Sequence, residues 1–311
     1  METLFLSPLT IIIIASIVVF FMAYGIGAND VANSMGTSIG SKALTLKQAI
    51  IIAAIFEFLG AYFGGGEVTS TIRKGIVDPT IYEDANKFII GMLSSLLAAG
   101  TWLIIASRRG WPVSTTHSIV GAIIGFVSIS KGVSYVSWGT VGGIASSWVT
   151  SPVIAGLLAF LIYLSAKKSI LDSTNPGRRA INVIPIYSFY VAFIISLVIA
   201  RKGLKNMGLE LPDSDIYMFS SIFGIIAAAI TYTLLRQNFS KIKENGIESA
   251  FAILMVVSAC AMAFAHGSND VANAIGPLAA IVSTVNSNGV IDTSSPVQAW
   301  ILFLGATGIV F

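Results

Sequence analysis

Long apolar runs alternate with short polar segments along most of this 311-residue chain. Six runs approach or reach the roughly 20 residues that a helix needs to cross a bilayer; they cover residues 9–28, 46–64, 87–106, 183–200, 216–235 and 247–266. Two others are less regular, because 117–130 is short for a span and 135–166 is long and contains Pro152. The pattern predicts an all-α membrane protein, with 117–130 as a short or re-entrant element and 135–166 as one kinked span or two half-spans.

Composition supports a membrane location. Hydrophobic residues make up 55% of the chain and charged residues 11%, whereas about 25% of an ordinary soluble domain is charged. The expected partner is therefore the lipid bilayer of the cell (plasma or inner) membrane, and no nucleic acid is expected. Cys260 is the only cysteine, which excludes an intrachain disulfide or a thiolate metal cluster.

The distribution of basic residues predicts an orientation. If 117–130 and 135–166 each cross once, seven spans precede residue 237. With the N-terminus outside, eleven lysines and arginines lie in inside loops and seven in outside loops. Because basic residues favour the cytoplasmic side, this balance favours an outside N-terminus.

One segment occurs twice. The sequence G-A-N-D-V-A-N at 27–33 returns 240 residues later as G-S-N-D-V-A-N at 267–273, each time at the end of an apolar run. An odd number of crossings between the copies would make them enter the membrane from opposite sides, as inverted-topology repeats of transporters do. We therefore expect 1–235 to hold the first inverted repeat with connecting spans, and 236–311 the start of the second.

The repeated segment has the composition of a functional helix break. Glycine lowers helix propensity, and Asx side chains favour caps and turns, so we expect a broken helix with a new half-helix starting near Val31. On that helix Asp30 and Asn33 share a face. Acids at membrane depth are usually functional. The simpler alternative makes Asp30 and Asp270 ordinary helix caps at the membrane surface.

A second motif follows Arg108 and Arg109. In W-P-V-S-T-T-H at 111–117, Pro112 and Ser114 indicate a helix start. The hydroxyls of Ser114, Thr115 and Thr116, together with free N–H groups at a helix N-terminus, can bind an oxyanion. The alternative is a plain capped transmembrane helix.

Three further residues carry smaller expectations. Glu57, inside the apolar run 46–64, suggests an ion or proton site, unless it pairs with a polar neighbour from another helix. For His117 and His266, a satisfied packing role is expected, with titration as the alternative.

At these motifs the chain resembles the inorganic phosphate transporter (PiT) family, through 27–33, 267–273, P-V-S-T-T-H at 112–117, and G-T-S-I-G-S-K-A-L-T at 36–45. The resemblance implies a cation-coupled phosphate symporter, a polytopic helical bundle of two inverted repeats, each with a broken helix and a re-entrant hairpin, often assembled as a homodimer. Carried over by position, the phosphate-binding residues are Asn33, Ser114, Thr115, Thr116, Ser268 and Asn273. The sodium-binding residues are Asn29, Asp30, Glu57, Asn269 and Asp270.

The chain departs from that family in one respect. No second segment like P-V-S-T-T-H occurs after residue 276. We therefore expect a truncated chain in which half of the phosphate site is missing.

The residues also predict a mechanism. Two aspartates at membrane depth repel phosphate, so a site with both needs cations. Sodium as the co-transported ion, with no other cofactor, would make cation and phosphate binding mutually dependent, and alternating access would complete symport. Proton or metal coupling, and sulfate or another oxyanion as substrate, remain alternatives. A channel or an intramembrane hydrolase built on Ser114 and His117 is less favoured, since Ser and His three apart give poor nucleophile–base geometry; no enzyme is expected.

Overall fold

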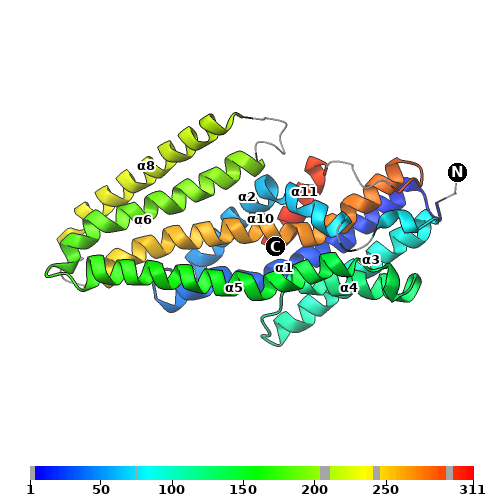
Figure 1. The fold of residues 1–311 in the computed structure, drawn as a ribbon, viewed down its shortest axis with the longest axis horizontal. Helices are drawn as coiled ribbons and strands as arrows, with labels where there is room; N and C mark the ends of the chain where they lie inside the picture. Colours follow the sequence, from blue (N-terminus) through cyan, green and yellow to red (C-terminus); the bar gives the residue numbers. More distant parts are fainter. Residues whose placement is uncertain (1–3, 75, 77, 204–210, 241–245, 292–296) are drawn as a thin grey trace. The chain divides into compact units, whose positions relative to one another are not determined.

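Every regular element that the structure describes is a helix. The structure is a computed structural model, and it describes all residues except 1–3, 75, 77, 204–210, 241–245 and 292–296. The α-helices (Figure 1) are α1 (Pro8–Gly40), α2 (Leu46–Lys74), α3 (Ala85–Arg108), α4 (Thr115–Ser130), α5 (Trp138–Ala166), α6 (Pro176–Val198), α8 (Asp213–Gln237), α10 (Glu248–Asn286) and α11 (Ala299–Val310). Short helical turns cover Pro79–Ile81, Val133–Tyr135, Lys167–Leu171 and Ile199–Gly203.

The lengths confirm a multi-spanning helical membrane protein. Among the described residues, seven helices are long and apolar enough to cross a bilayer: α1, α2, α3, α5, α6, α8 and α10. The shorter apolar helices are α4 and α11. The interpretation of 135–166 as one span agrees with the structure, because α5 runs through Pro152 as a single helix. The short run at 117–130 is α4, of 16 residues.

The predicted break at the repeated segment is wrong for both copies. Helix α1 continues without interruption through 27–33, and α10 through 267–273. The glycines serve close packing instead: a Cβ on Gly27 would overlap the backbone carbonyl of Ile309, and one on Gly267 would overlap that of Glu57. A helix-propensity cost of about 1 kcal/mol per glycine is small beside such packing.

Residues of the chain group into two compact units. The first contains residues 1–34, 51–141 and 263–311, and the second contains 35–50 and 142–262. This division follows packing and not sequence repetition, so the predicted repeat boundary near residue 235 stays a prediction.

The first unit has the more deeply buried core. Its fully buried side chains include Met22 on α1, Leu96 on α3 and Ile123 on α4. Small residues let its helices approach closely, as in many membrane proteins: Gly100 of α3 lies against the α1 backbone at Met22, and Gly91 lies against the ring of Phe126. This close packing places α1, α3 and α4 around the polar residues described below.

The second unit contains α6 and α8 as neighbouring helices (Figure 1). Gly224 of α8 lies against the ring of Phe189 of α6, and Arg201 pairs with Asp213 at 3.0 Å. The buried cluster of this unit consists of Ile170, Ala180, Ile184, Leu235 and Ala250. Helix α5 contributes no buried residue between Trp138 and Ala166, so an apolar helix surface remains for contact with lipid.

Candidate functional site

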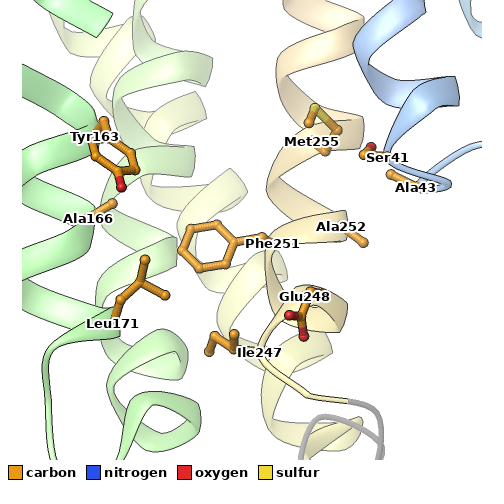
Figure 2. A pocket seen from close by; sticks show the side chains of 10 residues that line it. All are labelled: Ser41, Ala43, Tyr163, Ala166, Leu171, Ile247, Glu248, Phe251, Ala252 and Met255. Atoms are coloured by element: carbon orange, nitrogen blue, oxygen red, sulfur yellow. The ribbon is translucent and has the colours of Figure 1, made fainter. Parts of the chain in front are cut away.

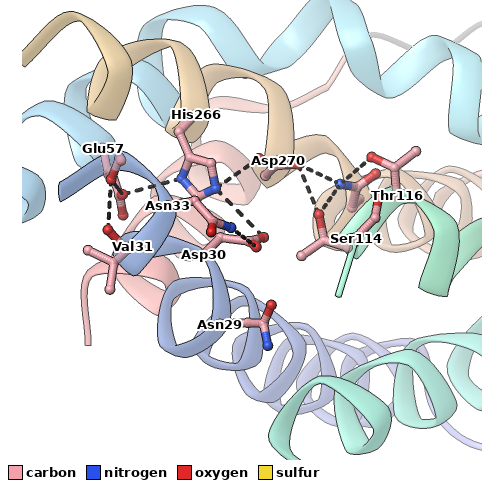
Figure 3. A network of polar contacts seen from close by, with 12 residues as sticks. Asn29, Asp30, Val31, Asn33, Glu57, Ser114, Thr116, His266 and Asp270 are labelled. Carbon is pink, nitrogen blue, oxygen red and sulfur yellow. Dashed lines mark hydrogen bonds and ion pairs between the residues drawn. The ribbon is translucent and has the colours of Figure 1, made fainter. Parts of the chain in front are cut away.

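A cluster of polar side chains lies within the first unit (Figure 3). Helix α1 contributes Asp30, α2 contributes Glu57, and α10 contributes His266 and Asp270. Glu57 is 2% exposed and Asp30 is 5% exposed. Buried charged groups are costly unless they are paired or bind ions, so this cluster is the strongest functional candidate among the described residues.

The imidazole of His266 lies among three carboxylates. Its Nε2 is 3.1 Å from Asp270 Oδ2 and 3.6 Å from Asp30 Oδ2, and its Nδ1 is 3.2 Å from Glu57 Oε1. One imidazole carries at most one positive charge, so three ionised carboxylates leave negative charge that is not balanced. The cluster is therefore suited to binding a cation.

Three of these groups have the spacing of metal ligands. One ligand atom each from Asp30, His266 and Asp270 lie within 4.8 Å of one another. Carboxylate oxygens suit sodium as well as harder divalent ions, whereas an imidazole nitrogen suits transition metals. The donor set fits a cation. Which cation it fits best depends on whether His266 is one of the ligands.

Hydroxyl and amide groups adjoin the carboxylates. Thr115 Oγ1 donates to Asp270 Oδ1 at 2.9 Å. The amide of Asn273 lies 3.1 Å from Asp270 Oδ1, 3.1 Å from Thr115 Oγ1 and 3.2 Å from Thr116 Oγ1. Asp270 thus contacts both the cation candidate and the groups that can donate to an oxyanion.

Ser114 starts α4, as the sequence predicts. Its side chain accepts a hydrogen bond from the backbone N–H of His117 at 3.3 Å, and it is the N-cap residue. The first turn of α4 therefore brings Thr115 and Thr116 to Asp270 and Asn273 with the helix N-terminus beside them. This arrangement is typical of an anion site.

Asn29 connects α1 to the loop that precedes α4. Its amide donates to Ser107 Oγ at 3.2 Å and to the carbonyl of Trp111 at 3.1 Å, while its Oδ1 accepts from Val113 N at 3.3 Å. Figure 3 shows Asn29 away from the carboxylates that surround His266. These contacts fit a residue that positions the loop.

The other predicted residues of the repeated segments lie in different surroundings. Asn33 is exposed and donates to Asp30 Oδ1 at 3.4 Å. Ser268 is buried against α2, at the place where Gly64 has no side chain. Asn269 is exposed, and the described residues include no hydrogen-bond partner for its side chain. The structure thus brings Asp30, Glu57, Asp270, Asn273, Thr115 and Thr116 together, and it leaves Ser268 and Asn269 outside these contacts.

Two residues of the cluster were missed by sequence reasoning. His266 was expected to pack, and this was wrong, since it contacts three acids. Its position four residues before Asp270, on the same helical face, is the signal that could have found it. Ser34, whose hydroxyl lies 3.3 Å from Glu57 Oε1, carries no comparable signal.

The fold and the buried cluster define the class: a multi-spanning membrane protein with acidic side chains buried in its interior, a combination typical of transporters. The profile of the phosphate transporter family matches residues 26–311. The chain belongs to the phosphate transporter family, as its motifs indicate, and this is a family of transporters and not of enzymes.

Individual relatives agree with this assignment. A Haemophilus influenzae protein that carries the name phosphate permease is 50% identical over 296 residues, which covers 93% of this chain and 70% of the relative. A Pyrococcus abyssi protein of the same name is 41% identical over 289 residues, with 93% and 70% covered. A solved structure named the sodium-dependent phosphate transporter is 38% identical, with a TM-score of 0.86, and the match covers 97% of this chain and 74% of that one.

Proposed function

We propose that this protein is a secondary active transporter that couples the uptake of inorganic phosphate to sodium. The observation that carries the proposal is the position of Asp270. One of its oxygens lies beside His266 in the acidic cluster, and the other accepts from Thr115 and Asn273. The same carboxylate can therefore respond to a cation and control the donors for phosphate.

Charge makes the two bindings dependent on each other. At an effective dielectric constant of about 20, two like charges about 4 Å apart repel by roughly 4 kcal/mol. Phosphate near Asp30 and Asp270 therefore binds weakly until sodium neutralises them. Each ligand raises the affinity for the other, which is the thermodynamic content of coupling.

Hydrogen bonds add a second link. Thr115 and Asn273 both donate to Asp270 Oδ1. A sodium ion on Asp270 competes for those oxygen lone pairs, and the hydroxyl and amide can then donate to phosphate oxygens. Cation binding thereby prepares the donors for the anion.

The residue assignments follow this logic. Asp30, Asp270 and Glu57 supply carboxylates for sodium, while Asn29 acts by positioning the loop before α4. Asn269, which is exposed, makes no direct contact with the ion in this proposal. Phosphate meets donors from two helices; these are Ser114, Thr115 and Thr116 at the start of α4 and Asn273 on α10. Asn33, which is exposed, and Ser268, which packs against α2, lie outside this set.

Alternating access between inverted repeats completes the proposed mechanism. The repeated segments support it, because their glycines make equivalent contacts: Gly27 receives a backbone carbonyl from α11, and Gly267 receives one from α2. Rocking of one repeat against the other would expose the site to each side in turn. The wider proposal is a homodimer in the cell membrane with its N-terminus outside, supported by family resemblance and by the distribution of basic residues.

One observation favours a different coupling ion. The nitrogen of His266 next to Asp30 and Asp270 completes a donor set that a divalent transition metal prefers over sodium. Metal–phosphate or proton-coupled transport is therefore the second candidate.

Radiolabelled phosphate uptake into proteoliposomes tests these proposals. The full-length protein is assayed at matched voltage under an inward sodium gradient, under an inward proton gradient, and with a divalent metal ion, each with excess cold sulfate as competitor. Uptake that follows sodium and resists sulfate supports sodium–phosphate symport. Uptake that needs protons or a divalent metal, or that sulfate abolishes, contradicts the proposed cation or the proposed substrate.

A further inference from the structure

The residues assigned above to phosphate and sodium include no lysine or arginine, although phosphate is an anion. Of the four side chains in the polar cluster, three are carboxylates, and only His266 can carry a positive charge. Phosphate that approaches this cluster from solution therefore meets a negative field until sodium is bound. A positively charged side chain near the start of α4 would raise the local concentration of phosphate there.

The cavity of the second unit does not supply such a charge. It has a volume of about 440 Å³ and lies where α5 ends and α10 begins (Figure 2). Its walls are mostly apolar, with Phe251 and Met255 among them, and Glu248 is the only charged residue among the described residues that line it. A carboxylate repels phosphate, so this cavity is not an entrance for phosphate.

Arg109 lies close to the phosphate donors along the chain. It is the C-cap residue of α3, and Ser114 begins α4 five residues later. Because a chain extends by at most about 3.4 Å per residue, the Cα atoms of these two residues are no more than about 17 Å apart. Arg109 is exposed, and among the described residues it has no carboxylate as an ion-pair partner. The protein therefore leaves its positive charge available to an anion.

The local sequence determines the path of the loop after Arg109. Gly110 has a φ of 67°, a conformation that glycine adopts without strain. The N–H of Gly110 donates to Ser107 O at 3.1 Å, and the N–H of Trp111 donates to Ala106 O at 2.9 Å. This pair of hydrogen bonds is the usual end of a helix that has glycine after its C-cap. The position of Trp111 thus follows from the way in which α3 ends.

Trp111 in turn fixes the guanidinium of Arg109. The Cζ atom of Arg109 lies 5.2 Å from the centroid of the Trp111 ring, within the range of a cation–π interaction. The carbonyl of Trp111 accepts from the amide of Asn29 at 3.1 Å, and the N–H of Val113 donates to the same side chain at 3.3 Å. The positive charge is therefore held on the loop that also positions the first turn of α4.

We propose that Arg109 attracts phosphate to the donors at the start of α4, and that Trp111 is the positioning residue for its guanidinium. The inference rests on the proposed transport of phosphate. Ser114 is exposed and Thr115 is buried, so phosphate gathered near Arg109 reaches the hydroxyl of Ser114 first and that of Thr115 after it. The guanidinium acts through its field and needs no contact with the sodium ligands.

Binding of radiolabelled phosphate to the full-length protein in detergent tests this role, because both faces of the protein are then open to solution. Binding is measured at about 10 mM sodium, where the Debye length is about 30 Å, and again with about 1 M choline chloride, where it is about 3 Å. Arg109→Gln is expected to raise the Kd for phosphate about threefold at low salt and to leave it unchanged at high salt. Arg109→Lys, which keeps the charge, is expected to stay near wild type.

Lys131→Gln is the matched control, because Lys131 also lies over an aromatic ring. Its Nζ is 5.3 Å from the centroid of Tyr82. Lys131 follows the 16 residues of α4 at the opposite end of that helix, about 24 Å from the phosphate donors. Its substitution is expected to change the Kd at low salt by less than about 1.5-fold. Trp111→Leu, which keeps the charge and removes the ring, is expected to raise the Kd about twofold at low salt.

The outcomes separate this inference from the proposed function. An unchanged Kd in Arg109→Gln at low salt, a loss that persists at high salt, or an equal loss in Lys131→Gln would overturn the role of Arg109 while wild type still binds phosphate with sodium. A wild-type Kd in Trp111→Leu would refute the positioning role of Trp111. Wild-type protein without sodium-dependent phosphate binding would contradict the proposed function, and the inference with it.

Discussion

The two copies of the repeated segment have almost the same sequence and different surroundings. In α1, Asn29 is buried and binds the loop before α4, while Asn33 is exposed with one long hydrogen bond. In α10 the pattern is reversed: Asn269 is exposed, and Asn273 is buried among Thr115, Thr116 and Asp270. Equal local sequences thus acquire different roles because different helices pack against them.

The aspartates should show the largest effect. Asp30→Asn and Asp270→Asn each remove a charge from the cation cluster, and we expect sodium-driven phosphate uptake to fall by about 100-fold or more, at least ~2.7 kcal/mol. Asp270→Asn should be the more severe, because Asp270 also orients Thr115. Uptake in proteoliposomes under a sodium gradient measures both. Wild-type sodium-dependent uptake in either variant would refute the assignment of that aspartate.

The next largest effect is expected for the last asparagines of the two segments, Asn33 and Asn273, and it should be large for only one of them. Asn273→Ala removes three buried contacts and is expected to raise the KM for phosphate by roughly 30-fold, about 2 kcal/mol. Asn33→Ala, at the exposed equivalent position, is expected to change the KM less than about threefold. Initial rates over a range of phosphate concentrations at saturating sodium would measure this. Equal effects would mean that both amides contact phosphate during transport.

For Asn29 and Asn269, the asparagines near the start of the two segments, we expect the opposite order: the substitution in α1 has the larger effect and the one in α10 the smaller. Asn29→Ala leaves Trp111 O and Val113 N without their partner, and we expect roughly a tenfold loss of uptake, about 1.4 kcal/mol. Asn269→Ala should stay within about twofold of wild type. The informative comparison is apparent sodium affinity: if both variants weaken it equally, the two amides are sodium ligands, and the loop-positioning role of Asn29 is wrong.

The paired glycines should show the smallest effect, on stability. Gly27→Ala and Gly267→Ala each place a methyl group against a backbone carbonyl, and we expect a loss of about 1 kcal/mol and a decrease in Tm of about 2–4 °C. Gly36→Ala is the matched control, because a Cβ there meets nothing within 4 Å. Thermal unfolding in detergent measures all three. If Gly36→Ala lowers the Tm as much as the others, the close contacts are not the cause.

Sequence was a good predictor of the membrane class, because the bilayer requires spanning helices of similar length and low charge. It also identified most of the polar cluster: Asp30, Glu57, Asp270 and Asn273 are acids or amides in or beside apolar runs, where such groups are rare unless they function. The start of α4 at Ser114 could be predicted from the sequence, because an N-cap depends only on residues about three positions apart.

The sequence does not predict that α1 and α10 continue unbroken through the repeated segments. Gly27 and Gly267 lower helix propensity by only about 1 kcal/mol each, and close contacts with Ile309 and Glu57 outweigh this cost. For His266 the only local signal is its place four residues before Asp270, because its other two acidic neighbours, Asp30 and Glu57, lie more than 200 residues away in the chain. The length of an apolar run and the cap of a helix depend on residues that are close in the sequence. The partners of Asn29, His266 and Asn273 depend instead on which helices pack together, and only the tertiary structure decides this packing.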